Sequence, residues 1–525
     1  EFMNLKQNYS YNSKNKIWSK NSQSLSFNAG IFGIKFNGKF NYVFSNYEFL
    51  NSFEKKTFGN EVLSFEENAN KKDTIYWNKN RPIPLTVEES TDYQKKDSIY
   101  LIRSSKTYLD SIDKKNNKFK ISNLVFGYTF KNSFKKTNFN YAGLLDLSSL
   151  SFNTVQGYNL ASGFSYFTGK DEKGKRIQIN TDFNYGFSEE RLRVTGRFYH
   201  RFNNKNYANL TINGGTKVEQ FNSNEPISTF INSSSTLFFK SNYMKLYNLE
   251  FARISYGQDV ANGININGKV EYLQRKPLFN TTDFTILKSE VPYTSNNPLD
   301  ENDFIKPGFE EHHLIKLGLN AQINFGNKYF SRPDGKFNFR NEKYPTLFLG
   351  FEKAVAGSDK KYEFEHLSSR IFYDLNLENK GNLAINLKGG KLFNASNIAF
   401  MDYKHFNGNQ THIGGTDRYL NVFNFMPYYS NSTNDSYFEA HIEHNDQGFI
   451  TNKIPLLNKL KSTLVIGFHE LAVPNRKPYT EYTVGLDNLG FGKFKLFRLD
   501  YIRSYQNGYI GDGVIFGLKI LNAID

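Results

Sequence analysis

The stretch RIQINTDFNYGFSEERLRVTGRFYHRF, residues 176–202, alternates two kinds of side chain almost without a break. In the first half the odd positions are apolar and include Ile177, Ile179 and Phe183, whereas the even positions are polar. In the second half the even positions Leu192, Val194 and Phe198 are apolar, and the odd positions carry arginines. Successive side chains of a β-strand point to opposite faces, so each half predicts a strand with one apolar face. Ser188-Glu189-Glu190 between the halves predicts a short turn, which in a membrane barrel belongs on the periplasmic side.

The same alternation returns along most of the chain. It is clear in GININGKVEY (263–272), LIKLGLNAQINF (314–325) and TEYTVGLDNL (480–489). Period-two alternation over about ten residues is typical of a transmembrane β-strand, whereas strands of soluble sandwiches are about half as long. The segments number roughly 16, and bacterial barrels have even strand numbers. We therefore predict an all-β fold, an antiparallel outer-membrane β-barrel. A soluble sandwich array or a solenoid is the alternative, although no fixed-period repeat is visible.

The composition excludes several other classes of protein. The 525 residues contain no run of 18 apolar residues, so the sequence predicts no transmembrane helix. They contain 51 Phe and 34 Tyr, too many aromatic residues for a disordered chain. The absence of cysteine excludes disulfides and thiolate metal sites.

The net charge of +15 indicates an anionic neighbour. Nucleic acid, acidic lipid headgroups and the phosphates of lipopolysaccharide would all fit. Basic residues are spread along strands and turns, and no basic helix or nucleic-acid module is recognisable. The expected partners are therefore outer-membrane lipid and lipopolysaccharide, and nucleic acid is not expected.

Two regions interrupt the alternation. Residues 61–118 are long and charged, and Thr86 with Glu89 forms a capping-box pattern that predicts a helix beginning after Pro84. We therefore divide the chain into first barrel strands at 1–60, a soluble insertion with a short helix at 61–118, and the remaining barrel at 119–525. The insertion could alternatively plug the lumen or dock a partner. Residues 228–258 predict one or two short helices in a loop or at the barrel mouth.

The basic residues on the polar strand faces are the main candidates for function. Those on the predicted lumen face are Arg193, Arg197, Arg201, Lys269 and Lys316. A ring of basic side chains would raise the local anion concentration and favour anions in a pore. A structural role is the alternative, in which the charges bridge to acidic or polar partners across a filled interior. The expected partners are Asp182, Glu439, His441 and Glu443.

Nine histidines raise the question of a metal or a catalytic site. The densest clusters are EEHH (310–313) and HIEH (441–444), but neighbouring residues of a strand point to opposite faces. Because zinc needs three or four converging ligands, we predict neither a metal site nor a cofactor. No GxSxG or HExxH motif occurs. The loop with His405, His412 and Asp417 is the best place for hydrolytic chemistry, yet the chain is expected not to be an enzyme.

Several long segments resemble one bacterial outer-membrane family. They include DTIYWNKNRPIPLTVEESTDYQKKDSI (73–99), NYMKLYNLEFARISYGQDVANGI (242–264), HFNGNQTHIGG (405–415) and LFRLDYIRSY (496–505). In that family a carboxypeptidase-regulatory-like domain precedes a large barrel region of unknown function. The resemblance implies that this chain is the C-terminal barrel part and that it lies in the outer membrane of a Gram-negative bacterium. It supplies no activity.

Three functions follow as hypotheses. The first is a non-enzymatic barrel that acts in envelope biogenesis or export together with other envelope proteins. It is similar in architecture to the assembly and translocation barrels of the outer membrane, which is an analogy of fold alone. The second is a porin-like diffusion channel that favours anions. The third is an outer-membrane barrel enzyme.

Overall fold

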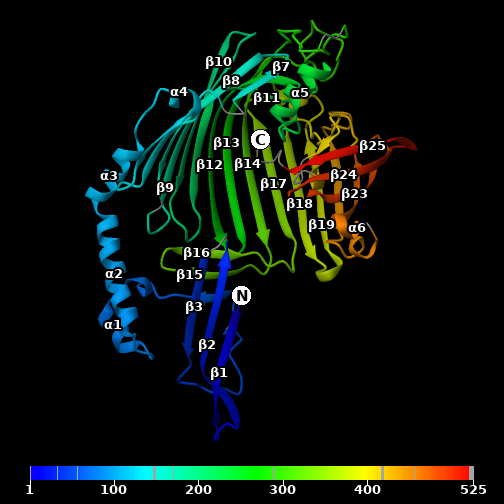
Figure 1. Cartoon of the computed structure of the whole chain (residues 1–525). Coiled ribbons are helices and arrows are strands. Elements are labelled where there is room, and N and C mark those ends of the chain that lie inside the picture. Colours follow the sequence, from blue (N-terminus) through cyan, green and yellow to red (C-terminus); the bar gives the residue numbers. More distant parts are fainter. Residues whose placement is uncertain are drawn as a thin grey trace. The chain divides into compact units, whose positions relative to one another are not determined.

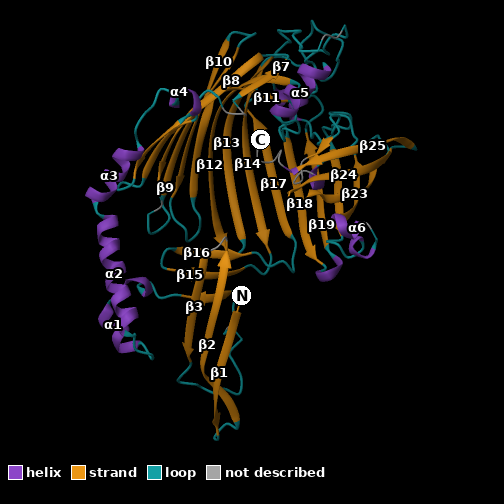
Figure 2. Ribbon diagram, in the orientation of Figure 1, coloured by secondary structure: helices purple, strands orange, loops and turns teal. Residues whose placement is uncertain are grey.

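The computed structural model describes residues 2–519 except 32–33, 56, 146–148, 170, 288–289, 415–418, 456 and 493. Strands dominate the described residues, and helices are few (Figures 1 and 2). The chain divides into two compact units, Glu1–Tyr100 and Leu101–Asp525.

The first unit begins with a three-stranded antiparallel sheet of its own. Its strands are β1 (Phe2–Asn12), β2 (Ile17–Ile31) and β3 (Ile34–Val43). Residues 1–60 therefore do not supply the first strands of the large sheet, contrary to the sequence-based division. Alternation predicts that a segment is a strand, but it does not identify the partner, and here the three strands pair with one another.

Helices follow this sheet. They are preceded by β4 (Glu61–Ser64) and comprise η1 (Ala69–Lys71), α1 (Thr74–Asn80), α2 (Val87–Ser104), α3 (Lys106–Asn116) and α4 (Asn123–Phe126). The Glu89 carboxylate accepts the Thr86 amide at 2.8 Å, and the Glu89 amide donates to the Thr86 hydroxyl at 3.2 Å. This reciprocal capping box fixes the start of α2 where the sequence predicts it. No helix among the described residues is long and apolar enough to cross a bilayer.

One large sheet forms the second unit and comprises nineteen strands among the described residues. The first are β5 (Tyr128–Asn132), β6 (Thr137–Tyr141), β7 (Leu150–Asn153), β8 (Gly157–Thr168), β9 (Arg176–Gly186), β10 (Arg191–Arg201), β11 (Asn209–Gln220), β12 (Leu246–Ala261), β13 (Ile264–Pro277) and β14 (His312–Asn324). The others are β17 (Thr346–Val355), β18 (Glu365–Asn376), β19 (Asn382–Phe393), β20 (Ile413–Gly414), β21 (Ser436–Asn445), β22 (Thr463–Ala472), β23 (Tyr479–Phe491), β24 (Phe494–Tyr505) and β25 (Tyr509–Leu518).

Four of these strands, β5, β6, β7 and β20, have five residues or fewer, and the rest have ten to sixteen. The large sheet thus has more strands among the described residues than the roughly 16 predicted, and the number of strands that span a membrane stays a prediction. Antiparallel registers link the series without a break from β5 to β25.

Smaller elements lie in the connections between the strands. They are α5 (Thr229–Phe239), β15 (Lys328–Arg332), β16 (Gly335–Phe339), η2 (Lys360–Tyr362), η3 (Glu378–Lys380), η4 (Phe400–Asp402), η5 (Tyr419–Asn421), η6 (Thr451–Lys453) and α6 (Leu457–Leu460). In residues 228–258, α5 is one predicted short helix, but the second half of that region belongs to β12. Strand β12 carries Gly257 and two polar residues near its end, which obscures the alternation.

The stretch 176–202 forms the predicted hairpin. Phe183 of β9 lies opposite Val194 of β10, and the pairing extends from Gly186–Arg191 to Arg176–Arg201. Its turn at 188–190 shares one end of the sheet with the connections 221–245, 278–311 and 394–435. Long connections belong to the extracellular end of bacterial barrels. The short turn thus lies at the end of the sheet that carries these long connections, and its periplasmic position stays a prediction.

The large sheet is apolar on its solvent-exposed face. Ile212, Ile254, Val270 and Leu317 lie opposite one another on the four adjacent strands β11 to β14 and are 41–53% exposed. A second such row, on β22 to β25, consists of Ile466, Val484, Tyr501 and Val514. The opposite face buries charged and polar residues instead. This distribution is the reverse of the one that a water-soluble sheet adopts.

Candidate functional site

The connection between β19 and β21 returns to the buried polar face of the large sheet. This internal segment, residues 394–435, is described except for 415–418 and includes η4, β20 and η5. Its residues Phe406, Phe423 and Met426 are buried in one cluster with Tyr437, Leu471 and Tyr479 of β21 to β23. Strand β20 also pairs in parallel with β25. The internal segment is thus packed against the sheet over much of its length.

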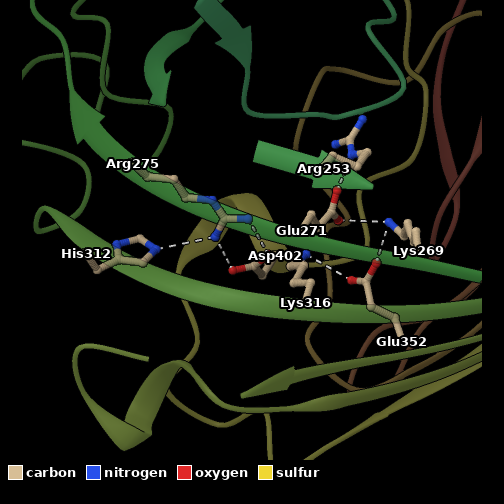
Figure 3. Close-up of polar contacts among 8 residues, drawn as sticks. All are labelled: Arg253, Lys269, Glu271, Arg275, His312, Lys316, Glu352 and Asp402. Carbon is tan, nitrogen blue, oxygen red and sulfur yellow. Dashed lines mark hydrogen bonds and ion pairs between the residues drawn. The ribbon is translucent and has the colours of Figure 1, made fainter. Parts of the chain in front are cut away.

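A buried ionic network fixes the first part of the internal segment (Figure 3). The Asp402 carboxylate accepts hydrogen bonds from Arg275 of β13 and pairs with the ammonium of Lys316 on β14 at 2.8 Å. Lys316 also donates to Glu352 of β17 at 2.9 Å. The side chain of Asp402 is 0% exposed and that of Arg275 4%. Because water reaches neither the Asp402 carboxylate nor the Arg275 guanidinium, each buried charge is stabilised by the other.

The network continues along the sheet through Lys269 of β13. Its ammonium donates to Glu352 at 3.2 Å and to Glu271 at 2.9 Å, and Glu271 also accepts from Arg253 of β12 (Figure 3). Gly318 stands beside this lysine, and a Cβ there would lie 2.5 Å from the Lys269 side chain. The glycine therefore makes room for the bridge between the two carboxylates.

Register explains why these residues meet. Glu271 lies opposite Lys316 across β13 and β14, and Gly318 lies opposite Glu352 across β14 and β17. Alternating positions on the buried face of adjacent strands thereby bring opposite charges into contact. Only Asp402 comes from outside the strands.

The charge on Asp402 is held by its partners. Burial alone would raise the pKa of this carboxyl, but the positive charges of Arg275 and Lys316 outweigh burial and hold its pKa below the usual range. Asp402 is therefore ionised at neutral pH, and the attraction between the internal segment and the sheet persists there.

The second part of the internal segment meets the C-terminal strands. The backbone amides of Asn424 and Phe425 both donate to the carboxylate of Glu481 on β23, each at 2.8 Å. The guanidinium of Arg498 on β24 lies 3.7 Å from the centre of the Tyr419 ring. It also donates to Glu443 of β21 at 2.8 Å. Two charged side chains of the sheet thus bind the segment directly.

The predicted polar partners lie near this region. Glu439 and His441 of β21 are buried and bond to each other at 2.7 Å. Glu439 also accepts from Lys388 of β19 at 2.9 Å, and a ring nitrogen of His441 lies 2.8 Å from one of His469. These residues form a paired network, and none of them bonds to the predicted arginines of β10.

The arginines of β10 do not form a ring of like charges. Arg193 is 1% exposed and bonds to Asn248 at 2.9 Å and to both oxygens of Glu189. Arg201 lies over the ring of Tyr207, with 4.6 Å between guanidinium and ring centre. Arg197 is exposed, and Asp182 forms no ion pair with an arginine within the described part of the chain. Although the three arginines are evenly spaced on one strand, each of them lies in a different environment.

The histidine clusters do not converge. His312 contacts Arg275 and stacks on Tyr362, with 4.1 Å between ring centres. In the described ranges, no three His, Asp or Glu side chains are placed to hold a metal ion.

The loop with His405, His412 and Asp417, the best place for hydrolytic chemistry in the sequence, belongs to the internal segment. His405 bonds to the Ser432 hydroxyl and the Phe400 carbonyl, and burial lowers its pKa to about 3. Both ring nitrogens are thus occupied, and the neutral imidazole packs the segment together. His412 stands against the Phe425 ring, and Asp417 lies outside the described residues.

Sequence reasoning missed Arg275, Glu352, Asp402, Glu481 and Arg498. Alternation could have found those on strands, because Arg498 shares the polar parity of its strand with Asp500 and Ser504. Asp402 lies in irregular backbone without periodicity, so no comparable pattern exists for it.

Comparison with known families assigns the chain. Residues 122–486 match the model described as "Family of unknown function (DUF5686) C-terminal domain". The chain belongs to this family. Residues 1–47 match the companion model, "Family of unknown function (DUF5686)". No curated protein matches the chain. The family assignment agrees with a barrel region of unknown function, and the carboxypeptidase-regulatory-like domain finds no support in it.

Three solved structures with some likeness come from bacteria. BamA from Haemophilus ducreyi lacking POTRA domains 1–3 is 11% identical, with a TM-score of 0.39 over 98% of this chain and 88% of that one. CdiB from Acinetobacter baumannii is 11% identical, with a TM-score of 0.34 over 73% of this chain and 59% of that one. OccK11 (OpdR) from Pseudomonas aeruginosa is 12% identical, with a TM-score of 0.25 over 72% of this chain and 91% of that one. These scores are too low to support an inference about function.

Proposed function

We propose that this DUF5686 protein is an integral outer-membrane β-barrel of a Gram-negative bacterium, formed when β25 joins β5. The apolar rows on β11 to β14 and on β22 to β25 face lipid, and the buried charges face the lumen. Outer-membrane lipid and lipopolysaccharide surround the barrel. Nucleic acid is not a partner.

We also propose that the barrel is filled rather than open. This proposal rests on the ion pairs that Asp402 forms with Arg275 and Lys316. These buried pairs hold the internal segment against the inner face of the sheet. A diffusion pore needs a hydrated passage, whereas here the charges of the network around Asp402 and Glu352 neutralise one another. Such a barrel passes material only when the internal segment moves.

A filled barrel suits the handling of a client better than the free diffusion of solutes. We therefore assign the protein to envelope biogenesis or export, acting with other envelope proteins and without enzymatic activity. A carboxypeptidase-regulatory-like domain preceding the barrel, as in the family it resembles, would be one place for partners to dock. Both ring nitrogens of His405 are bonded, which supports a structural rather than a hydrolytic role for the loop that holds His405 and His412.

An anion-favouring channel is the second candidate, favoured by Arg197. This arginine is exposed on the polar parity of β10, and the chain carries a net charge of +15. If the internal segment left the lumen, Arg197 and the lysines of the network would line an anion-favouring passage.

Single-channel recording in planar bilayers separates these candidates. We expect the wild-type protein to stay closed and Asp402→Ala to open, because this change leaves Arg275 buried without its carboxylate and leaves Lys316 with Glu352 alone. Removing one partner of a buried ion pair costs about 3–5 kcal/mol. Asp435→Ala is the control, since Asp435 belongs to the same segment but is exposed. A steady anion-selective current from the wild-type protein would establish the channel instead.

Depletion of the protein from cells tests the biogenesis role. The expected result is a change in the surface proteins or lipids of the outer membrane, measured by proteomics and lipid analysis of isolated membranes. An unchanged outer membrane would remove the biogenesis proposal and leave the filled barrel intact. Proteins that co-purify from native membranes would identify the partners.

A further inference from the structure

The three-stranded sheet β1–β3 has one apolar face and one polar face. On the apolar face, Leu25 of β2 lies between Leu5 of β1 and Phe40 of β3, and Phe27 stacks on Phe40 with 6.0 Å between ring centres. The opposite face presents Asn, Ser and Lys side chains at the alternate positions, such as Asn8 and Ser22, which bond at 2.8 Å.

A register shift extends the apolar face to the end of the β1–β2 hairpin. The shift falls between Asn8 and Tyr9, so that Tyr9 pairs with Lys20 and Tyr11 with Trp18. Without it, Trp18 would fall on the polar face with Ser24 and Ser26. Instead, the Tyr11 and Trp18 rings meet at 5.3 Å beside the turn that carries Lys14 and Lys16.

This face is exposed. Met3, Leu5, Tyr11, Trp18 and Phe40 are each at least 50% exposed, and Trp18 is 66% exposed. Large contiguous apolar patches on a folded unit mark sites where another surface binds. Trp and Tyr next to Lys are the residues that settle at the boundary between acyl chains and headgroups.

The charge of the sheet β1–β3 indicates which kind of surface its apolar face binds. Residues 2–47 contain six lysines, Lys6, Lys14, Lys16, Lys20, Lys35 and Lys39, and no Asp or Glu. Lys6 and Lys39 lie on the polar face, opposite Ser24 and Ser26. Lys14, Lys16 and Lys20 instead lie at the end of the sheet that carries Tyr9, Tyr11 and Trp18. Lysines beside aromatic residues, with no Asp or Glu in residues 2–47, match an anionic bilayer.

We propose that the apolar face of β1–β3 is a membrane-docking surface that binds a bilayer of anionic phospholipid. Tyr9, Tyr11 and Trp18 enter the boundary between headgroups and acyl chains, and Lys14 and Lys16 bind the phosphates. This contact is separate from the barrel and does not rest on the function proposed for it.

Tryptophan fluorescence tests this proposal, because the chain contains only Trp18 and Trp77. Trp77→Phe, in α1, leaves Trp18 as the only reporter. The full chain is held in nanodiscs of zwitterionic lipid, and vesicles of phosphatidylglycerol or of phosphatidylcholine are added. We expect a blue shift of the emission and quenching by brominated acyl chains with phosphatidylglycerol, and at least tenfold weaker binding to phosphatidylcholine.

The lysines of the turn provide the matched variants. Lys14→Gln with Lys16→Gln should weaken binding to phosphatidylglycerol vesicles by about tenfold or more at low salt. Lys79→Gln with Lys95→Gln, on α1 and α2 of the same unit, removes the same charge and should leave binding unchanged.

Three results would overturn the proposal. Emission that does not respond to either vesicle would mean that the face binds no bilayer. Equal responses to both lipids would remove the anionic requirement. Emission that is already blue-shifted and protected from aqueous quenchers before vesicles are added would mean that protein covers Trp18.

Discussion

At the scale of single residues, the large sheet depends on the exact pairing of buried charges. The sequence leaves two roles open for Lys269 and Lys316, free charges in a pore or bridges to acidic partners, and in the structure each lysine bridges two carboxylates. Alternation shows that a lysine faces the lumen, whereas its partner is set by the register of the next strand. The role of Lys316 also depends on Asp402, which is 86 residues further along the chain and belongs to no strand.

Gly318 offers a test of this pairing. In Gly318→Ala the new methyl group would displace Lys269 and break its bonds to Glu271 and Glu352. We expect a loss of about 1–3 kcal/mol in the free energy of unfolding, measured by urea titration in detergent. Gly268→Ala is the control, because no atom lies within 4 Å of a Cβ at that position. Equal stabilities of the two variants would show that the bridge contributes nothing.

At the scale of elements, the sequence predicts strands and caps well and connections poorly. The hairpin β9–β10 follows from the alternation of side chains along a strand. The capping box of α2 follows from residues that lie three positions apart. The internal segment follows no such rule. It is held by hydrogen bonds to Glu481 and by Arg498 against Tyr419, contacts that join residues more than fifty positions apart.

The connection between β21 and β22 provides an element-scale prediction. Asp446 accepts the backbone amides of Gly448, Ile450, Thr451 and Leu464 at 2.7–3.0 Å. Burial alone would raise the pKa of Asp446, but these four hydrogen bonds outweigh it and hold the pKa below its usual value of 3.8. Because the folded-state pKa is lower than the unfolded one, the stabilisation is complete above pH 3.8 and decreases as the pH falls through the folded-state value.

Asp446→Asn should therefore destabilise the protein at pH 7 by about 1–3 kcal/mol, and this difference should shrink as the pH falls below 3.8. The measurement is the urea midpoint of both proteins between pH 7 and pH 3. Asp435→Asn, an exposed aspartate in the internal segment, is the control for the loss of one charge. A difference that stays constant over this range would assign the effect to packing rather than to the charge.

At the scale of the whole molecule, alternation predicts a large sheet but not which strands belong to it. The described residues of β1, β2 and β3 alternate like the rest, yet they pair with one another in a small sheet whose apolar face includes Leu5, Leu25 and Phe40. The proposed membrane position of the large sheet depends instead on a collective property, the apolar rows that run across neighbouring strands. The sequence of a single strand does not show whether an apolar row continues on the neighbouring strands.

The absence of cysteine allows this position to be tested residue by residue, because every introduced thiol is the only one. We expect Val270→Cys and Leu317→Cys, in one apolar row, to resist a water-soluble maleimide in proteoliposomes and to react with a lipid-soluble one. Tyr100→Cys, on α2 and 70% exposed, should react with the water-soluble reagent at an ordinary rate. At least a tenfold difference in rate is expected, because a thiol ionises and reacts poorly in hydrocarbon. Equal rates at Val270→Cys and Tyr100→Cys would place the rows in water, and the polar, buried interior would then require a soluble assembly that covers them.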